Sequence, residues 1–246
     1  MVYTYDVFKE ELIKNSSGLD EKYTTDDVVK KLHIICSELD RCSKMFNLTA
    51  ICEPDEVLKK HIIDCLFLAA EIDKLAGDGE FKVLDVGSGA GFPSLPLAAA
   101  VERASVTALD STAKKIGYIK ATSELMEVSG FDAVASRAEE AARSEMRENY
   151  DFVCARAVAR LSVLMELCVP FLKVGGYFVS MKGAAADEEI AEAKNAANKL
   201  GCEFIASVPY SISDLPDKRF LVIYKKNSKT IDMYPRNYSQ ISKKPL

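Results

Sequence analysis

The sequence contains no apolar run of the roughly 20 residues that a membrane-spanning helix needs. Its first ten residues carry acids and tyrosines, without the basic and then apolar regions of a secretory signal. We therefore expect a cytoplasmic protein with no membrane partner. Internal repeats, low-complexity tracts and Pro/Gly-rich linkers are also missing, so the 246 residues suit one sizeable domain, or one domain with a small appendage.

Metal-binding patterns are scarce as well. The chain has two histidines and seven cysteines, and no two cysteines form a C-x-x-C pair. Most of the cysteines stand in apolar surroundings, where a cysteine usually behaves as a small buried hydrophobic residue. Because zinc sites need clustered thiolates or imidazoles, we expect reduced, buried thiols and no metal site.

A net positive charge is lacking over most of the chain, whose formal net charge is −5. Residues 218–246 hold eight basic residues and one acid, a net charge of +7, which leaves −12 on residues 1–217. A basic segment on an acidic body is expected when one face meets a polyanion. A solubilising, frayed C-terminus is the alternative, and composition fits both equally.

Residues 1–76 are predicted to form a helical extension packed on the core. Apolar residues recur at spacings of three and four over 24–46, which predicts a helix. A second helix is predicted over 54–76, with a proline and two acids in its first turn and a Gly-Asp-Gly stretch after it.

From residue 77 onward the pattern predicts an α/β domain. Short apolar runs alternate with helical stretches of roughly 10 to 20 residues, which is the signature of a parallel sheet buried on both faces. Two later strands are separated only by a loop, so we expect an antiparallel hairpin at one edge. The predicted strands are 81–86, 105–110, 131–136, 151–156, 177–182, 203–210 and 220–226.

The most informative stretch is VLDVGSGAGFP, at 83–93. Gly87, Gly89 and Gly91 follow a predicted strand in alternation, where glycines allow a tight turn and a close approach of backbone amides to a ligand. The dinucleotide fingerprint is G-x-G-x-x-G, whereas this spacing is G-x-G-x-G, preceded by Asp85. The pattern favours a methionine-bearing nucleoside, whose ammonium Asp85 suits directly or through water.

Asp110 ends the second predicted strand, where a carboxylate can accept both ribose hydroxyls and would repel the extra phosphate of NADP. Alone, the glycines would suit any strand-to-helix turn, and Asp110 would suit a helix cap. Together, in this order and spacing, these features predict that residues 77–246 form a Rossmann-like class I methyltransferase domain that uses S-adenosylmethionine.

Two methyltransferase subclasses lack their motifs here. After the fourth predicted strand the chain reads Arg156-Ala157-Val158-Ala159, without the [DN]-P-P-[YF] of enzymes that methylate exocyclic amines. Cys154 has no proline neighbour, unlike the nucleophile of enzymes that methylate pyrimidine C5. A ring nitrogen such as guanine N7 needs neither device and no general base, because no proton leaves it. We therefore assign no catalytic residue and expect catalysis by alignment.

Three other functions remain open at this stage. They are a small-molecule methyltransferase, an RNA-binding regulator that transfers no methyl group and, against the glycine spacing, an NAD-dependent dehydrogenase. Over residues 45–246, however, the segments MFNLTAI, HIIDCL, DVGSGAGFPSLPLA, LDSTAKKI, SRAEE, YDFVCARAVA, LKVGGYFVSMKG and YPRNYSQISKKPL occur in order. In these segments the chain resembles the small-subunit ribosomal RNA guanine-N7 methyltransferases (the RsmG or GidB family).

The resemblance implies methylation of guanine N7 in bacterial 16S rRNA, at position 527 in that family. The partner would be 16S rRNA, the small ribosomal subunit or an assembly intermediate. The resemblance also implies that the cofactor is contacted at Gly87 and Phe92, at the Ala138-Glu139 step and at Arg156, while Asp85 and Asp110 carry over from the wider methyltransferase pattern. Phe92 would pack against adenine, or belong to the core.

Three further residues have two interpretations each. His61 and Asp64 share one helix face and can hydrogen bond to each other. Either they line the guanine or cofactor pocket, or His61 is a partly buried, satisfied histidine. Lys182 follows the fifth strand, where it contacts phosphate or is solvated.

The tail supplies the remaining candidates. Arg219, which resembles a family arginine, is expected to contact phosphate, as are Arg236 and Lys243. The tail departs from the family at Ser239 and Ile241, which stand for a glycine and a proline, and it is expected to lie away from the cofactor site.

Overall fold

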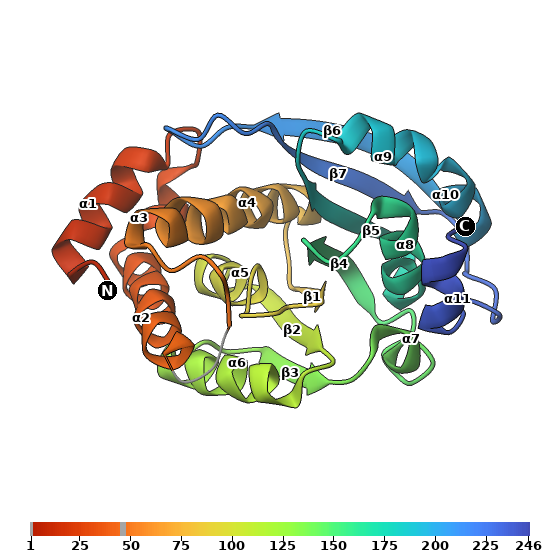
Figure 1. Cartoon of the computed structure of the whole chain (residues 1–246), viewed down its shortest axis with the longest axis horizontal. Coiled ribbons are helices and arrows are strands. Elements are labelled where there is room, and N and C mark those ends of the chain that lie inside the picture. The colour runs from red at the N-terminus through yellow and green to blue at the C-terminus, as the bar shows by residue number, and fades with distance from the viewer. Residues whose placement is uncertain (1, 45–47) are drawn as a thin grey trace.

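The computed structural model describes residues 2–44 and 48–246. Its centre is one seven-stranded sheet of order β3-β2-β1-β4-β5-β7-β6 (Figure 1). The first five strands are mutually parallel, and the last two form the predicted antiparallel hairpin at one edge. The strands are β1 (Phe81–Val86), β2 (Ala104–Asp110), β3 (Phe131–Ala135), β4 (Tyr150–Arg156), β5 (Leu172–Lys182), β6 (Cys202–Tyr210) and β7 (Arg219–Lys226).

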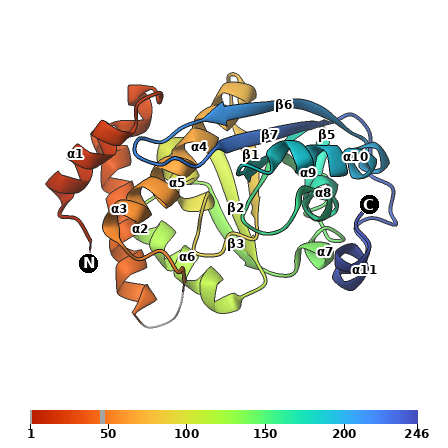
Figure 2. The ribbon, with the colours of Figure 1, turned by 45° about the horizontal axis from the view of Figure 1, so that its top comes forward.

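Helices lie against both faces of the sheet (Figures 1 and 2). On β4, Val153 and Ala155 belong to a core cluster with α8 and α10, while Phe152 and Cys154 belong to another with α4 and α5. This alternation explains why the strand is apolar throughout. The helices are α1 (Tyr5–Asn15), α2 (Asp26–Ser43), α3 (Pro54–Val57), α4 (Asp64–Ala76), α5 (Ser94–Ala100), α6 (Ala113–Leu125), α7 (Ala138–Ala141), α8 (Leu161–Cys168), α9 (Ala186–Glu192), α10 (Lys194–Leu200) and α11 (Tyr238–Lys243).

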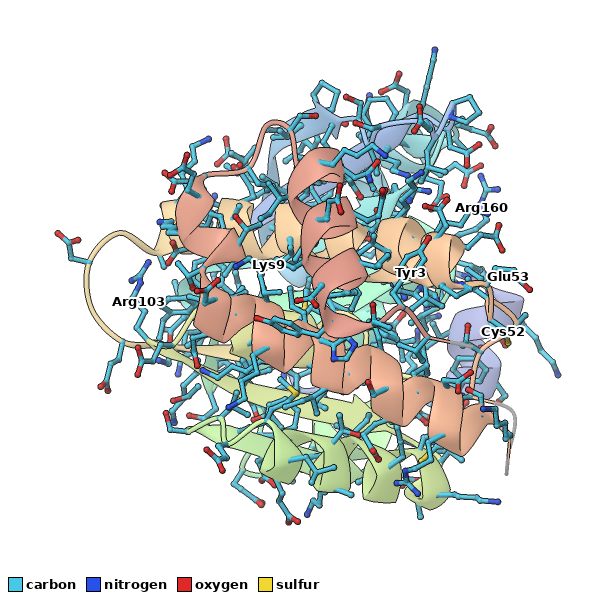
Figure 3. All side chains as sticks on the ribbon, turned by 90° about the vertical axis from the view of Figure 1, so that its left-hand side faces the viewer. Tyr3, Lys9, Cys52, Glu53, Arg103 and Arg160 are labelled. Carbon is cyan, nitrogen blue, oxygen red and sulfur yellow. The ribbon has the colours of Figure 1, made fainter. Side chains whose placement is uncertain are left out.

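The N-terminal helices cover one end of the molecule (Figure 3). Phe8 and Leu12 of α1 and the apolar stripe of α2 share a buried cluster with residues of α4, α5 and α6. Lys9 of α1 also donates to Asp26, at the start of α2, over 2.6 Å (Figure 3). The helical extension is thus packed against the sheet domain through a common core.

The helix predicted over 54–76 is interrupted in its middle. A π-helical segment, Leu58–Ile63, joins α3 to α4. Such segments are rare and often occur at functional sites, because they redirect backbone carbonyls and side chains. This segment contains His61, one of the candidate site residues.

The cysteines are free, and six of the seven are buried, as the sequence predicts. Cys52 is the exception and lies exposed, in the segment before α3. Among the residues that the structure describes, no helix is both long and apolar enough to cross a membrane. The same residues include no group of three or more His, Cys, Asp or Glu side chains arranged to hold a metal ion.

Candidate functional site

Two adjoining cavities open at the carboxyl ends of the parallel strands, where ligands bind in this type of fold. The glycine-loop cavity, of about 490 Å³, is lined by the turn after β1, the end of β2, the start of α7 and Arg156. The arginine cavity, of about 750 Å³, is lined by Arg156, Arg160 and Arg219 with residues that follow β4 and β5. Both cavities are lined by His61, Arg156, Ala157 and Val158.

The glycine loop is held by the neighbouring strand. The amides of Gly87 and Ser88 donate to the carbonyl of Leu109, over 2.8 and 3.1 Å. Gly87 has a φ of +78°, and a Cβ at this position would lie 2.5 Å from Cγ2 of Val158. Glycine is therefore needed here both for the turn and for the close approach of Val158.

Gly91 has a different role from that predicted. It is absent from the described residues that line the cavity. Its φ is +85°, and a Cβ there would lie 2.4 Å from Cδ1 of Leu95. Gly91 thus lets α5 pack against the loop, whereas Gly87 and Gly89 line the cavity itself.

Asp85 lies beneath the loop rather than in the cavity lining. It is fully buried, and its Oδ2 accepts a hydrogen bond from the amide of Ser94 over 3.1 Å. Burial raises the pKa of this carboxyl to about 6. Asp85 thus supports the start of α5 through Oδ2, while its Oδ1 is buried without a hydrogen-bond partner.

Asp110 joins the loop to the next helix while lining the cavity. Its Oδ2 accepts from the amide of Gly89 over 3.0 Å, and its Oδ1 accepts from the amide of Thr112 over 2.8 Å. A carboxylate has about four acceptor sites, so it can still accept hydrogen bonds from a ligand. The helix-cap interpretation is wrong, because the N-cap of α6 is Thr112, and Asp110 instead holds the turn that precedes it.

The start of α7 forms the far wall of the cavity, with Ala138 and Glu139 in the lining. The first amides of a helix have no partner within it, and α7 has no side-chain cap. The Glu139 carboxylate accepts from Nε of Arg137 over 2.9 Å. Both Ala138 and Glu139 therefore line the cavity as expected, with backbone donors suited to a polar ligand edge.

Phe92, His61 and Arg156 form a stack at the boundary between the cavities. The rings of His61 and Phe92 are nearly parallel, with centroids 4.6 Å apart, and the Arg156 guanidinium lies 5.4 Å from the Phe92 centroid. Only 3% of Phe92 is exposed. Phe92 thus belongs to the core and lines the cavity at once.

His61 is neutral at physiological pH. Nη2 of Arg156 donates to its Nδ1 over 2.9 Å, so the ring proton is on Nε2, which lies 3.1 Å from Oγ1 of Thr49. Burial, and then the charge of Arg156, lowers the pKa of His61 to about 3. His61 is therefore a fixed hydrogen-bonding group rather than a general base.

His61 and Asp64 do not form the hydrogen bond that their spacing allows. Oδ1 of Asp64 accepts from the hydroxyl of Tyr210 over 2.7 Å and from Nη1 of Arg219 over 2.8 Å. Its Oδ2 lies 3.3 Å from Nη1 of Arg156, which also donates to the carbonyl of Lys60. Arg156 thus contacts both side chains, His61 through Nη2 and Asp64 through Nη1.

The other candidates in the arginine cavity are also ion-paired. Arg219, expected to contact phosphate, is held by Asp64, and its side chain is 16% exposed. Nζ of Lys182 donates to Glu189 over 2.7 Å and to the carbonyl of Ala159 over 2.9 Å. The solvated interpretation of Lys182 is therefore wrong, since only 8% of its side chain is exposed.

Sequence comparisons identify the family. Residues 28–211 match the family model described as rRNA small subunit methyltransferase G.

The chain belongs to this family.

Two relatives with the family name are similar over nearly their whole length. The protein of Ligilactobacillus salivarius is 38% identical over 224 residues, covering 90% of this chain and 92% of the relative. The protein of Lactobacillus johnsonii is 38% identical over 245 residues, covering 98% of this chain and 99% of the relative. The resemblance found in the sequence segments is thereby confirmed.

Solved structures confirm the predicted fold. TYW2 of M. jannaschii, solved in complex with AdoMet, has a TM-score of 0.52 at 15% identity, over 66% of this chain and 76% of that one. A predicted O-methyltransferase of Agrobacterium tumefaciens has a TM-score of 0.52 at 19% identity, over 68% of this chain and 82% of that one. At such identities the likeness concerns the class I methyltransferase fold alone.

The tail of this family member is ordered, so the frayed alternative is wrong. Arg236 donates to the fully buried Glu166 through its backbone amide, Nε and Nη2, over 2.8, 2.9 and 2.6 Å. Its guanidinium is therefore engaged within the protein rather than free for phosphate. Lys243 is exposed, and Ile241, at the family's proline position, is fully buried.

The expected separation of the tail from the cofactor site is also wrong, because Tyr238 lines the glycine-loop cavity. Sequence reasoning missed this residue, and it missed Thr49, Val158, Tyr210 and Glu166 as site or anchoring residues. Thr49 and Val158 stand inside segments that carry the family resemblance, which was the available signal. For Tyr210, the sequence indicated only that it ends an apolar predicted strand.

Proposed function

We propose that this chain transfers a methyl group from S-adenosylmethionine to N7 of a guanine in 16S rRNA, in the cytoplasm. The observation that supports this most is the pair of adjoining cavities, which share Arg156 and Val158 at the carboxyl ends of the strands. One cavity suits a nucleoside donor and the other a base with its phosphates. A methyl group can pass between them only at the shared boundary.

The residues of the glycine-loop cavity fit the donor. Gly87 and Gly89 expose backbone, Asp110 retains acceptor capacity for ribose hydroxyls, and Ala138 and Glu139 begin a helix with free amides. These groups follow β1, β2 and β3, which are consecutive in the sheet, so they suit an extended ligand lying across the strand ends. When bound, S-adenosylmethionine supplies a methyl group on a positively charged sulfur.

The arginine cavity suits the acceptor. Six cations line it (Lys60, Arg156, Arg160, Lys182, Lys218 and Arg219), against three acids (Asp64, Glu189 and Asp217). Guanine presents O6 and N7 as acceptors on one edge, and donors such as Arg156 can hold O6 while N7 stays free to attack. The ion pairs of Asp64 and Glu189 limit the local positive charge, so the methylated, cationic guanine is tolerated.

No residue has to remove a proton. Guanine N7 carries no proton, so its lone pair would accept the methyl group directly while the electrons of the carbon–sulfur bond return to sulfur, and no general base would be needed. Arg156 is held by Asp64, Lys60 and His61, which fixes the boundary between the two ligands. Such alignment can account for several kcal/mol of barrier reduction.

The deciding experiment identifies the modified base. Protein-free 16S rRNA and small ribosomal subunits lacking the modification are incubated with the chain and isotopically labelled S-adenosylmethionine, digested with nucleases and analysed by mass spectrometry. The expected product is 7-methylguanosine at one site. Finding 2-methylguanosine, N6-methyladenosine or a ribose methyl would contradict the N7 assignment, and labelling of neither RNA would contradict the function.

Donor affinity should depend on pH through Asp85. Its pKa of about 6 means that the carboxyl is neutral below pH 6 and charged above it. The ammonium of the methionine part, which Asp85 suits, would stabilise the charged form, so S-adenosylmethionine should bind about three- to tenfold more tightly at pH 7 than at pH 5. Calorimetric titration across pH would measure this pH dependence of donor affinity.

Turnover at saturating donor should stay flat between about pH 6 and 8, since His61 remains neutral.

Two controls test the cause. 5′-Methylthioadenosine lacks both the ammonium and the sulfonium charge, and Asp85→Asn lacks the titrating group, so each should flatten the pH dependence of binding. A dependence that persists unchanged in Asp85→Asn would assign it to another group.

A further inference from the structure

The C-terminal helix α11 is fixed to the body of the protein just before it begins. Arg236 is paired with Glu166 over 2.6 Å, and Arg147 donates to the carbonyl of Tyr234 over 2.9 Å. Arg143 donates to the carbonyl of Pro235. The position of the residues that follow, including Tyr238, is therefore set by contacts from two other parts of the chain.

Tyr238, the first residue of α11, lies at the glycine-loop cavity. It is among the residues that line this cavity, and 41% of it is exposed. The Arg137 guanidinium lies 5.1 Å from the centroid of its ring, and α11 is beside α7 in both views (Figures 1 and 2). Arg137 is in turn paired with Glu139 of α7. An aromatic ring and a guanidinium thus meet at the cavity wall.

The order of the strands indicates which part of the donor would meet this wall. Arg156 marks the boundary with the arginine cavity at the end of β4, so the methyl group belongs at that side. Asp110 follows at the end of β2, and the Ser136–Glu139 segment follows β3, the outermost strand. If Asp110 holds the ribose, the adenine lies toward β3, beside Arg137 and Tyr238.

We propose that Tyr238, backed by Arg137, forms the stacking wall for the adenine of S-adenosylmethionine, which makes α11 part of the donor site. Aromatic rings and guanidinium groups both stack on purines, and each aromatic stack on a base contributes measurably to binding. The inference rests on the proposed donor, because it assigns one end of that ligand. It also makes donor affinity depend on the Arg236–Glu166 pair that positions α11.

The test is calorimetric titration with S-adenosylmethionine and with 5′-methylthioadenosine, which lacks the amino-acid part. Tyr238→Ala and Tyr238→Leu should each lower the affinity for both ligands to the same extent, by about tenfold. Tyr238→Phe should bind both ligands like the unmodified chain. Phe204→Ala is the matched control, since Phe204 of β6 is an aromatic residue with a similar exposure of 42%. It is not among the described residues that line either cavity. Ser242→Ala, at an exposed position of the same helix, controls for changes within α11.

The outcomes separate the two proposals. Unchanged affinity in Tyr238→Ala and Tyr238→Leu, with normal binding by the unmodified chain, overturns the stacking wall and leaves the methyltransferase assignment standing. Weaker binding of S-adenosylmethionine with unchanged binding of 5′-methylthioadenosine also overturns the stacking wall, because the contact would then be with the amino-acid part. An unmodified chain that binds neither ligand overturns the donor assignment and the wall together.

Discussion

Asp64→Ala is expected to lower methyl transfer by about a hundredfold or more. The Asp64 carboxylate is buried and joins Tyr210, Arg219 and Arg156, which come from three different strand ends. Its removal frees Arg156 to shift at the boundary of the two cavities, and a displacement of about 1 Å at a reacting centre can cost a hundredfold in rate. Single-turnover assays with labelled donor would measure the effect.

The same substitution should also destabilise the fold, because it leaves two partly buried guanidinium groups without their carboxylate. Breaking a buried ion pair typically costs about 3–5 kcal/mol of the free energy of unfolding. Asp217→Ala is the matched control, since Asp217 approaches the same Arg219 at 3.9 Å but its side chain is 68% exposed. That variant should change both stability and rate little. Equal effects of the two substitutions would show that the network does not depend on Asp64.

Arg236→Ala is expected to give the largest loss of stability in the tail, again about 3–5 kcal/mol. Glu166 is fully buried, and Arg236 satisfies both of its carboxylate oxygens. In the variant, the buried carboxylate would lose its charged partner and keep only the hydrogen bond from the backbone amide of residue 236. Urea unfolding followed by circular dichroism suits this test, since the chain has no tryptophan to report by fluorescence.

Two variants make this prediction specific. Lys243→Ala, in the same helix but exposed, should change the free energy of unfolding by less than about 0.5 kcal/mol. The double variant Glu166→Leu with Arg236→Ala should be more stable than Arg236→Ala alone, because it removes the unpaired carboxylate. A double variant that loses the sum of the two single effects would show that the pair is not coupled.

The sequence was sufficient for features that depend on local pattern. The strands, the glycine turn and the position of Asp110 follow from residues within a few places of one another. The hairpin follows from the short loop between 203–210 and 220–226. The π-helical segment in 54–76 has no comparable signal, because apolar spacing is nearly the same in both helix types.

The partners of charged side chains could not be predicted in this way. Arg236 and Glu166 are separated by 70 residues, and Asp64 and Arg219 by 155. A basic tail composition therefore suggested phosphate contacts for arginines that the fold uses internally. Likewise, His61 and Asp64 share a helix, but their hydrogen bonds are decided by Arg156, which arrives from β4.

The burial of six cysteines and exposure of the seventh have a practical consequence for solution work. Burial raises the pKa of thiols such as Cys36, Cys65 and Cys168, which suppresses their reaction with electrophiles. A maleimide dye should then label the native chain at Cys52 alone. The Cys52 thiol lies 3.8 Å from the carbonyl of Thr49, whose hydroxyl contacts His61. A fluorophore on the unmutated protein would thus report on RNA arriving at the cavity boundary.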